Sequence, residues 1–278
     1  MGLTIGRYEL ERKLAQGSMG AVYLARDPYM KRPVAIKVLA YDLTEDDLCL
    51  DFFQREAEAI AALEFPAIVP IYDVGQHGSQ PFLVMQYMPG GSLEEKLAAG
   101  MRPRPLAQVF KRIAAALDAA HAQNIIHCDV KPANILFDAA NKAYLADFGL
   151  AKFLDQNTGL TSTMLMGTPE FMSPEQVRGE RPLAQSDIYA LGITLFYGLT
   201  GAYPYDKGNE MATAAAHVKE PVPNIHQFAP DLPAFWQDIL QKALAKAPLD
   251  RYKTAVALAE DVLAGVNGRW HLNKLLAI

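Results

Sequence analysis

The hydrophobic pattern of this chain changes from strand-like to helical at Met-Pro-Gly-Gly-Ser, residues 88–92. Before this point, short runs rich in β-branched and aromatic residues are separated by turns that carry Gly and Pro, which is typical of strands. These runs are YELERKL, AVYLARD, PVAIKVL, IVPIYDVGQ and PFLVMQY. One interruption, DFFQREAEAIAALE, has Phe53, Ala57, Ile60 and Leu63 at helical spacing. The first part of the chain therefore predicts a small, mostly β lobe with one helix.

Helical patterns dominate the remainder of the chain. The segment LAQVFKRIAAALDAAHAQN has Val109, Ile113, Leu117 and Ala120 on one helical face. Further helical stretches centre on residues 187–200, 234–246 and 254–264. We therefore expect an α+β protein of two lobes, with a Pro-Gly hinge near residues 86–91. A cleft between two lobes is a usual place for a ligand.

Composition and charge exclude several classes of protein. Hydrophobic residues make up 51% and charged residues 21%, as expected of a soluble globular protein. The net charge is −5 and no basic run stands out, so nucleic acid is not an expected partner. Cys49 and Cys128 are too few for a disulfide framework and suggest reduced thiols. The start of the chain lacks the apolar core of a signal peptide, and Gly6 stands where a myristoylation motif has Ser or Thr.

The longest uncharged apolar run, residues 188–201, is shorter than the roughly 20 residues of a membrane span. A buried core helix is the simpler interpretation. We therefore expect a cytoplasmic location, on the cytoplasmic side of a membrane if the full chain is anchored.

A glycine-bearing turn lies between the first two strand-like runs. In LAQGSMGAV, residues 14–22, the small residues Ala15, Gly17 and Gly20 would let backbone N–H groups approach phosphate oxygens. An ordinary hairpin explains the turn equally well. A strand follows the turn where a dinucleotide-binding motif has a helix, which disfavours that class.

Lys37, at the end of VAIK, is a second candidate. A single lysine at a strand end is usually a solvated surface residue. Glu56, however, shares a predicted helix face with Phe53 and Ile60, so it should point toward the core. A buried carboxylate needs a cation, and Lys37 is the available one.

The third candidate is IIHCDVKPANIL, followed by ADFGLAK. Asp129 and Asn134 come from the first segment and Asp147 from the second. Singly, such residues more often form turns. Two carboxylates and an amide on adjacent loops suit Mg²⁺, which keeps water ligands and takes substrate phosphate oxygens.

Together these elements form an ordered set: a Gly-bearing turn, a strand lysine, a helix glutamate, His-x-Asp-x-x-x-x-Asn and Asp-Phe-Gly. With this set the chain resembles the eukaryotic-like Ser/Thr protein kinase family from about residue 8 to 263, and the wording of IIHCDVKPANIL and GTPEFMSPEQ is most like bacterial members. The resemblance implies a protein kinase fold with a mainly antiparallel β N-lobe (about 8–85), a hinge (about 86–91) and a mainly helical C-lobe (about 92–263). Residues 264–278 would be a terminal helix on the large lobe or the start of a linker.

The resemblance also implies ATP as the nucleotide and assigns its contacts. The glycine-rich loop would comprise Leu14, Ala15, Gln16, Gly17, Ser18, Met19, Gly20, Ala21 and Val22. The adenine would lie between Val22, Ala35 and Leu136, beside the gatekeeper Met85 and the hinge from Gln86 to Met88. Lys37 would contact the α- and β-phosphates and pair with Glu56.

The catalytic roles follow from the same resemblance. Asp129 would accept the proton of the substrate hydroxyl, Lys131 would neutralise the transferring phosphoryl group, and Thr168 would contact Asp129. Asn134 and Asp147 would hold Mg²⁺, with Mn²⁺ as an alternative metal. Lys131 and GTPEFMSPE are typical of the Ser/Thr branch rather than the tyrosine branch.

Three further residues match structural positions of the family. Glu175 and Arg251 correspond to a buried ion pair. Asp187 corresponds to the aspartate that caps a helix and supports the catalytic loop.

Two positions depart from the family pattern. Ala15 replaces the first glycine of the loop, which costs little where φ is negative. Cys128 stands where most members have the arginine that binds a phosphorylated activation-loop residue. The acceptors offered there are Thr158, Thr161, Ser162 and Thr163, and Lys152 supplies a second basic position. We therefore predict weak dependence on loop phosphorylation. For the thiol, a small inert cysteine is favoured over a redox role.

The expected partners are protein substrates with Ser or Thr acceptors, and self-association for autophosphorylation is a further expectation. A membrane becomes a partner only if the chain continues beyond this segment. Two alternatives stay open. A pseudokinase would typically lack at least one of Lys37, Glu56, Asp129, Asn134 and Asp147, all of which are present. A small-molecule kinase would not be expected to carry Lys131 or GTPEFMSPE.

Overall fold

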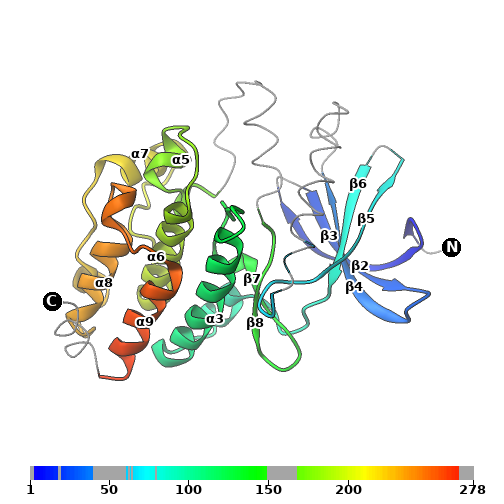
Figure 1. Cartoon of the computed structure of the whole chain (residues 1–278), viewed down its shortest axis with the longest axis horizontal. Coiled ribbons are helices and arrows are strands. Elements are labelled where there is room, and N and C mark those ends of the chain that lie inside the picture. Colours follow the sequence, from blue (N-terminus) through cyan, green and yellow to red (C-terminus); the bar gives the residue numbers. More distant parts are fainter. Residues whose placement is uncertain are drawn as a thin grey trace.

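The computed structural model describes residues 3–17, 20–39, 61, 63, 65–78, 80–148 and 168–268. Two lobes lie next to each other along the long axis of the molecule, one built around a sheet and one built from helices (Figure 1). The predicted α+β architecture of two lobes is confirmed. The helix predicted within residues 51–64 lies outside the described residues, apart from Ala61 and Leu63.

The small lobe is a six-stranded antiparallel sheet in the order β1-β2-β3-β4-β6-β5. Its strands are β1 (Thr4–Ile5), β2 (Tyr8–Gly17), β3 (Gly20–Asp27), β4 (Arg32–Leu39), β5 (Ile71–His77) and β6 (Gln80–Gln86). The sequence predicted β2, β3, β4 and β6 closely, but it started β5 too early. Residues 68–70 are not part of that strand, because Pro70 has no N–H to donate and Val69 bonds to the large lobe instead.

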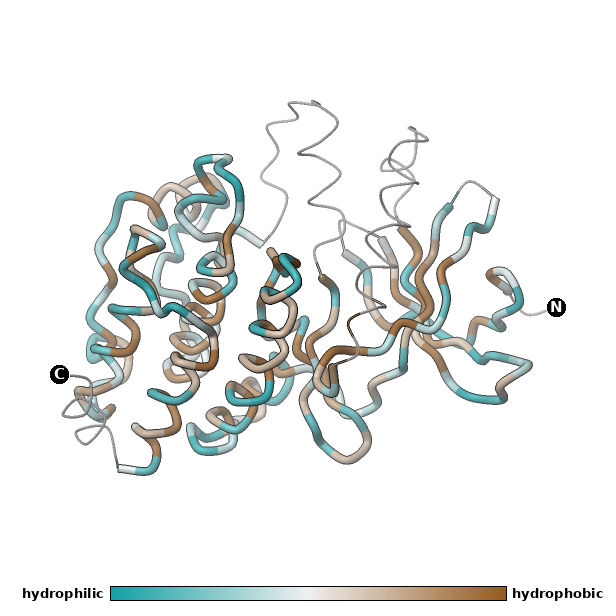
Figure 2. Tube along the Cα trace, viewed as in Figure 1, coloured by the Kyte–Doolittle hydropathy of each residue, from teal (hydrophilic) through white to brown (hydrophobic). Residues whose placement is uncertain are grey.

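Alternating side chains give the sheet two buried faces. On one face Val34 and Ile36 of β4 pack with Tyr8, Phe82 and Val84 in a cluster confined to the small lobe. On the other face Ala35, Leu83 and Met85 join the core that continues into the large lobe. Hydrophobic residues accordingly follow the strands where they meet the large lobe, as the brown segments of Figure 2 show. The second face therefore supplies one wall of the space between the lobes.

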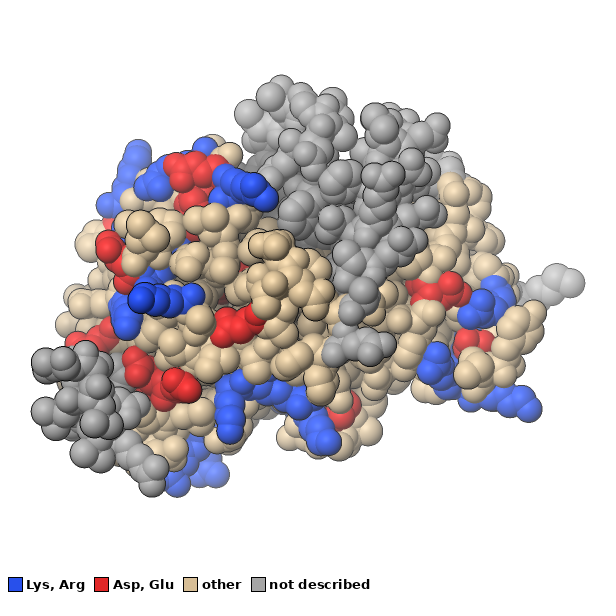
Figure 3. Space-filling model, in the orientation of Figure 1, with Lys and Arg blue, Asp and Glu red and all other residues tan. Residues whose placement is uncertain are grey.

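The large lobe is mainly helical. Its α-helices are α2 (Leu93–Ala98), α3 (Pro103–His121), α5 (Pro174–Val177), α6 (Ala184–Thr200), α7 (Glu210–Lys219), α8 (Phe235–Ala243) and α9 (Ala255–Val266). Short 3-10 turns and a two-stranded sheet complete it: η2 (Pro132–Asn134), η3 (Pro169–Phe171), η4 (Ile225–Gln227), η5 (Pro248–Asp250), β7 (Ile135–Phe137) and β8 (Ala143–Leu145). Lysines, arginines and acidic residues are interspersed over the face of this lobe seen in Figure 3.

Helix α6 is the centre of the large lobe. Every residue from Ser186 to Phe196 is buried, so this helix is apolar on all sides, as the run at residues 188–201 predicted. Gly192 allows close packing: a Cβ there would lie 2.9 Å from the Cβ of Ala243. Among the described residues, no helix combines the length and the hydropathy that crossing a membrane requires.

A segment of the small lobe is bonded directly to the large lobe. The N–H of Val69 donates to the carbonyl of Leu145 at 2.9 Å, and the N–H of Leu145 donates to the carbonyl of Ala67 at 2.8 Å. Arg112 of α3 donates to the carbonyls of Pro66 and Ala143, so one guanidinium joins both partners of this contact. These bonds place β8, and the loop that follows it, against the small lobe.

Candidate active site

The loop after α3 is held by Asp187 in the first turn of α6. The buried carboxylate of Asp187 accepts hydrogen bonds from the N–H groups of His127 and Cys128, each at 2.8 Å. Cys128 has a φ of 65°, a region that costs a residue with a side chain roughly 1–2 kcal/mol. The two bonds stabilise this conformation, and Asp129 follows it directly. Asp187 thus fixes the backbone that carries Asp129.

His127 connects this loop to the loop after β8. Its Nδ1 accepts the N–H of Asp129 at 3.2 Å, and its Nε2 lies 2.9 Å from the carbonyl of Ala146. Burial lowers the pKa of His127, so the ring is neutral, with Nε2 as the donor. The ring also packs on Phe148 with centroids 4.5 Å apart. His127 therefore fixes the loop that carries Asp129 against the loop that carries Asp147.

Asp129 lies in a cluster of polar side chains. Asn134, brought close by the 3-10 turn η2, donates from Nδ2 to the carbonyl and to Oδ2 of Asp129 at 2.8 and 2.9 Å. The Nζ of Lys131 lies 2.9 Å from the same Oδ2 and donates to the hydroxyl of Thr168 at 2.8 Å. The structure thus brings together four residues that the sequence singled out, from both sides of the segment 149–167.

Lys37 and Asp147 meet across the two lobes. The Nζ of Lys37 on β4 lies 2.9 Å from Oδ1 of Asp147, and both side chains are partly buried. Asp147 has a φ of 56°, so the chain turns sharply at this residue. The pairing of Lys37 with Glu56 stays a prediction, because Glu56 lies outside the described residues.

The residues predicted to contact the nucleotide lie on β2, β3, β4, β6 and β7 and on the segment after β6. The register pairs Ala15 with Val22, Val22 with Lys37, and Ala35 with Met85. Gly20 has a φ of 136°, and a Cβ there would lie 2.0 Å from the carbonyl oxygen of Val38, so only glycine fits. Ala15 does not adopt a positive φ, which satisfies the condition under which alanine is tolerated.

The remaining residues predicted to contact the nucleotide lie near these paired strands or outside the described residues. Leu14, Val22 and Leu136 are partly buried against the core that joins the lobes, and Gln86 and Met88 follow Met85. Gln16, Gly17 and Ala21 belong to the hairpin of β2 and β3. Ser18 and Met19 lie outside the described residues.

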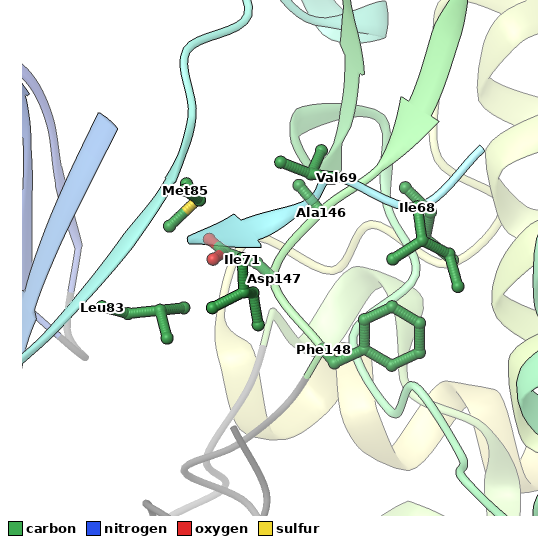
Figure 4. A pocket seen from close by; sticks show the side chains of 9 residues that line it. Ile68, Val69, Ile71, Leu83, Met85, Ala146, Asp147 and Phe148 are labelled. Atoms are coloured by element: carbon green, nitrogen blue, oxygen red, sulfur yellow. The ribbon is translucent and has the colours of Figure 1, made fainter. Parts of the chain in front are cut away.

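A mostly apolar pocket lies beside Met85, the residue predicted as gatekeeper (Figure 4). It is lined by Ile68, Val69, Ile71, Leu83, Met85, Leu145, Ala146, Asp147 and Phe148. The sequence missed most of these residues, because Ile68, Val69 and Ile71 were interpreted together as one strand. No local pattern marks the contact between that segment and β8.

Glu175 and Arg251 form the buried ion pair that the resemblance predicted. Two guanidinium nitrogens lie 2.7 and 2.8 Å from the two carboxylate oxygens, and Ser186 donates to Glu175 at 2.6 Å. Burial alone would raise the pKa of Glu175, but the hydrogen bonds from Arg251 and Ser186 outweigh it and lower the pKa. The pair fixes α5, which follows the segment of Thr168, against the loop before α9.

The donors present fit a magnesium ion that takes most of its ligands from phosphate and water. Asp147 supplies a carboxylate, and Asn134 uses only its Nδ2 in the hydrogen bonds to Asp129, which leaves an amide oxygen for a metal. In the described part of the chain, no three His, Cys, Asp or Glu residues form a metal-binding group. Such a sparse oxygen set is typical of Mg²⁺ bound with a nucleotide and unlike a structural zinc site.

The profile of the protein kinase domain matches residues 8–263. The chain belongs to the protein kinase family. This kinase domain is 37% identical over 259 residues to serine/threonine-protein kinase PrkC of Bacillus subtilis, and the match covers 92% of this chain and 40% of PrkC. It is 40% identical over 271 residues to serine/threonine-protein kinase PknB of Mycobacterium tuberculosis, with 94% of this chain and 43% of PknB covered.

Solved structures agree with this assignment. The crystal structure of the Mycobacterium tuberculosis PknI kinase domain superposes with a TM-score of 0.77 at 29% identity, covering 96% of this chain and 98% of that one. The kinase domain described here spans about 40% of the length of the curated relatives PrkC and PknB.

Proposed function

We propose that this kinase domain transfers the γ-phosphoryl group of Mg-ATP to serine and threonine hydroxyls of protein substrates, including its own. The observation that carries the proposal is the cluster of Asp129, Lys131, Asn134 and Thr168, which His127 links to the segment that carries Asp147 of the Lys37–Asp147 pair. A general base, a cation for the transferring group and two oxygen donors for a metal are the parts that phosphoryl transfer requires.

Each part has a distinct task. Asp129 accepts the proton of the acceptor hydroxyl, and its carboxylate is oriented by Asn134 and Lys131. Lys131 lies between Asp129 and Thr168, where its charge stabilises the phosphoryl group as it moves. Asn134 and Asp147 would hold Mg²⁺, which neutralises phosphate charge when bound. Lys37 contacts the α- and β-phosphates, and Val22, Ala35 and Leu136 enclose the adenine.

The experiment is a transfer assay with purified protein, labelled ATP, Mg²⁺ and a generic protein substrate such as casein, followed by phosphoamino-acid analysis. We expect phosphoserine and phosphothreonine on the substrate and on the kinase itself, with Mn²⁺ tested as a replacement metal. Nucleotide binding without transfer would indicate a pseudokinase. Transfer to small hydroxylated molecules but not to protein would indicate a small-molecule kinase. Phosphotyrosine as the main product would contradict the roles of Lys131 and Thr168.

The setting of the activity is also proposed. We expect a cytoplasmic domain that self-associates during autophosphorylation, and a gel-filtration profile before and after incubation with Mg-ATP tests the second point.

A further inference from the structure

His121, which the sequence did not single out, lies between two carboxylates at the end of α3. Its Nε2 is 2.7 Å from Oδ2 of Asp187, and its Nδ1 is 3.8 Å from Oδ1 of Asp118. Asp118 accepts the N–H groups of Ala255 and Val256, at 2.8 and 2.9 Å, in the first turn of α9. One imidazole therefore links the start of α9 to the aspartate that holds the catalytic loop.

The charges around His121 determine its protonation state. Asp118 faces it from its own helix and Asp187 from α6. Burial lowers the pKa of a histidine, but hydrogen bonds and charge from the two carboxylates outweigh it and raise the pKa of His121 to about 9. The imidazole of His121 is therefore a cation at neutral pH.

Asp187 depends on this cation. Its side chain is 1% exposed, and within the described ranges no lysine or arginine forms an ion pair with it. Oδ2 of Asp187 accepts hydrogen bonds from the backbone N–H of His127 and from Nε2 of His121. Oδ1 accepts a hydrogen bond from the backbone N–H of Cys128. A buried carboxylate that loses its counter-charge must move or become solvated. Either response breaks the hydrogen bonds from the N–H groups of His127 and Cys128 to Asp187, and these bonds stabilise the positive φ of Cys128.

We propose that His121 and Asp118 are positioning residues for the phosphoryl transfer proposed above. Asp118 orients the imidazole, the imidazole fixes the carboxylate of Asp187, and Asp187 sets the backbone of residues 127–129. The inference rests on the proposed function for its kinetic consequences, but its structural step can be measured without turnover.

The kinetic test compares wild type with His121→Gln, Asp118→Asn and the double variant. We expect His121→Gln to lower kcat roughly 10- to 100-fold, as small displacements of a catalytic group do, with KM for ATP within about twofold. Asp118→Asn should lower kcat by a smaller factor and add little in the double variant, because both residues act through one contact. His77→Gln, at the exposed histidine that ends β5, is the matched control and should leave kcat unchanged.

The pH profile separates positioning from general stability. Wild-type kcat should fall as pH rises through about 9, and the variant His121→Gln should show a flatter profile over the same range. All assays are run well below the melting temperature of each variant, so that a folded protein is compared with a folded protein.

Amide hydrogen exchange tests the structural step directly. In His121→Gln the N–H groups of His127 and Cys128 should exchange faster by at least about tenfold, while amides in α8 stay unchanged. If wild type transfers no phosphate, the proposed function fails, and the exchange result alone decides this inference. The inference is overturned if exchange at His127 and Cys128 is unaltered, or if kcat of His121→Gln stays within about twofold of wild type. Should His121→Gln fail to fold, Asp118→Asn is judged by the same two criteria.

Discussion

The ammonium of Lys37 lies 2.9 Å from a carboxylate oxygen of Asp147, and this ion pair joins the two lobes across the candidate active site. Lys37 comes from the sheet of the small lobe, and Asp147 follows β8 of the large lobe. A metal-bound nucleotide would therefore enter a site whose two charged groups already face each other. The position of Asp147 makes it the first residue to test.

Asp147→Asn should abolish the magnesium dependence of ATP binding. The substitution keeps the size of the side chain but removes the negative charge that a hard cation requires. Titration calorimetry with ATP, in the presence and absence of Mg²⁺, measures this directly. Equal magnesium enhancement in the variant and in wild type would show that Asp147 is not a metal ligand.

Asp129→Asn should leave ATP affinity nearly unchanged and lower turnover by about 10²–10⁴, the usual contribution of a general base. Asparagine has the same size as aspartate and keeps one oxygen that can accept the hydrogen bond from Asn134, but it cannot accept the hydroxyl proton. Asp231→Asn, at an exposed aspartate, provides the control. Wild-type turnover in Asp129→Asn would remove this residue from the mechanism.

Glu175→Gln should destabilise the protein by about 3–5 kcal/mol, because it leaves the buried guanidinium of Arg251 without a counter-charge. Glu180→Gln is the matched control, since the Arg178–Glu180 pair is exposed and contributes about 1 kcal/mol or less. Urea unfolding of the two variants and wild type gives both values. Equal midpoints for Glu175→Gln and wild type would contradict a stabilising pair.

The stability that His121 contributes should decrease with rising pH. Its pKa is about 9 in the folded state and near the ordinary histidine value of 6.5 in the unfolded state. The contribution is therefore complete below about pH 6.5 and is lost as pH rises through about 9. The free energy of unfolding, measured from pH 6 to 10, should converge between wild type and His121→Gln at the alkaline end. A difference that grows with pH would have the wrong sign.

Activity should depend little on phosphorylation of the loop between Asp147 and Glu175. Cys128 is buried with its thiol 3.7 Å from the carbonyl of Ile126, and a thiol cannot bind phosphate as arginine does. The acceptors Thr158, Thr161, Ser162 and Thr163 lie outside the described residues, so this prediction rests on Cys128 itself.

The measurement compares three forms: autophosphorylated wild type, phosphatase-treated wild type, and a variant with all four acceptors changed to alanine. Turnover should stay within about tenfold in all three, a difference in activation free energy of roughly 1.4 kcal/mol. A larger decrease in either unphosphorylated form would show that another basic group replaces the missing arginine.

The sequence by itself determined the division into a β-rich and a helical part, and the residues around which the chemistry is built. Short runs rich in β-branched and aromatic residues located β4 and β6, because each strand is buried on both faces. The apolar run at residues 188–201 located α6, because that helix is buried on all sides. The helices α2 and α7 were not predicted. The first is six residues long, and the second is rich in alanine, so neither shows a strong apolar stripe.

Only the tertiary structure decided which of these residues act on one another. The contacts of His121 with Asp187, Lys37 with Asp147, and Val69 with Leu145 join segments that are distant in the chain. Local patterns record which face of an element is buried, but not which partner covers it. That choice is made when the elements pack together, because a buried charge or backbone group is stable only where a partner reaches it.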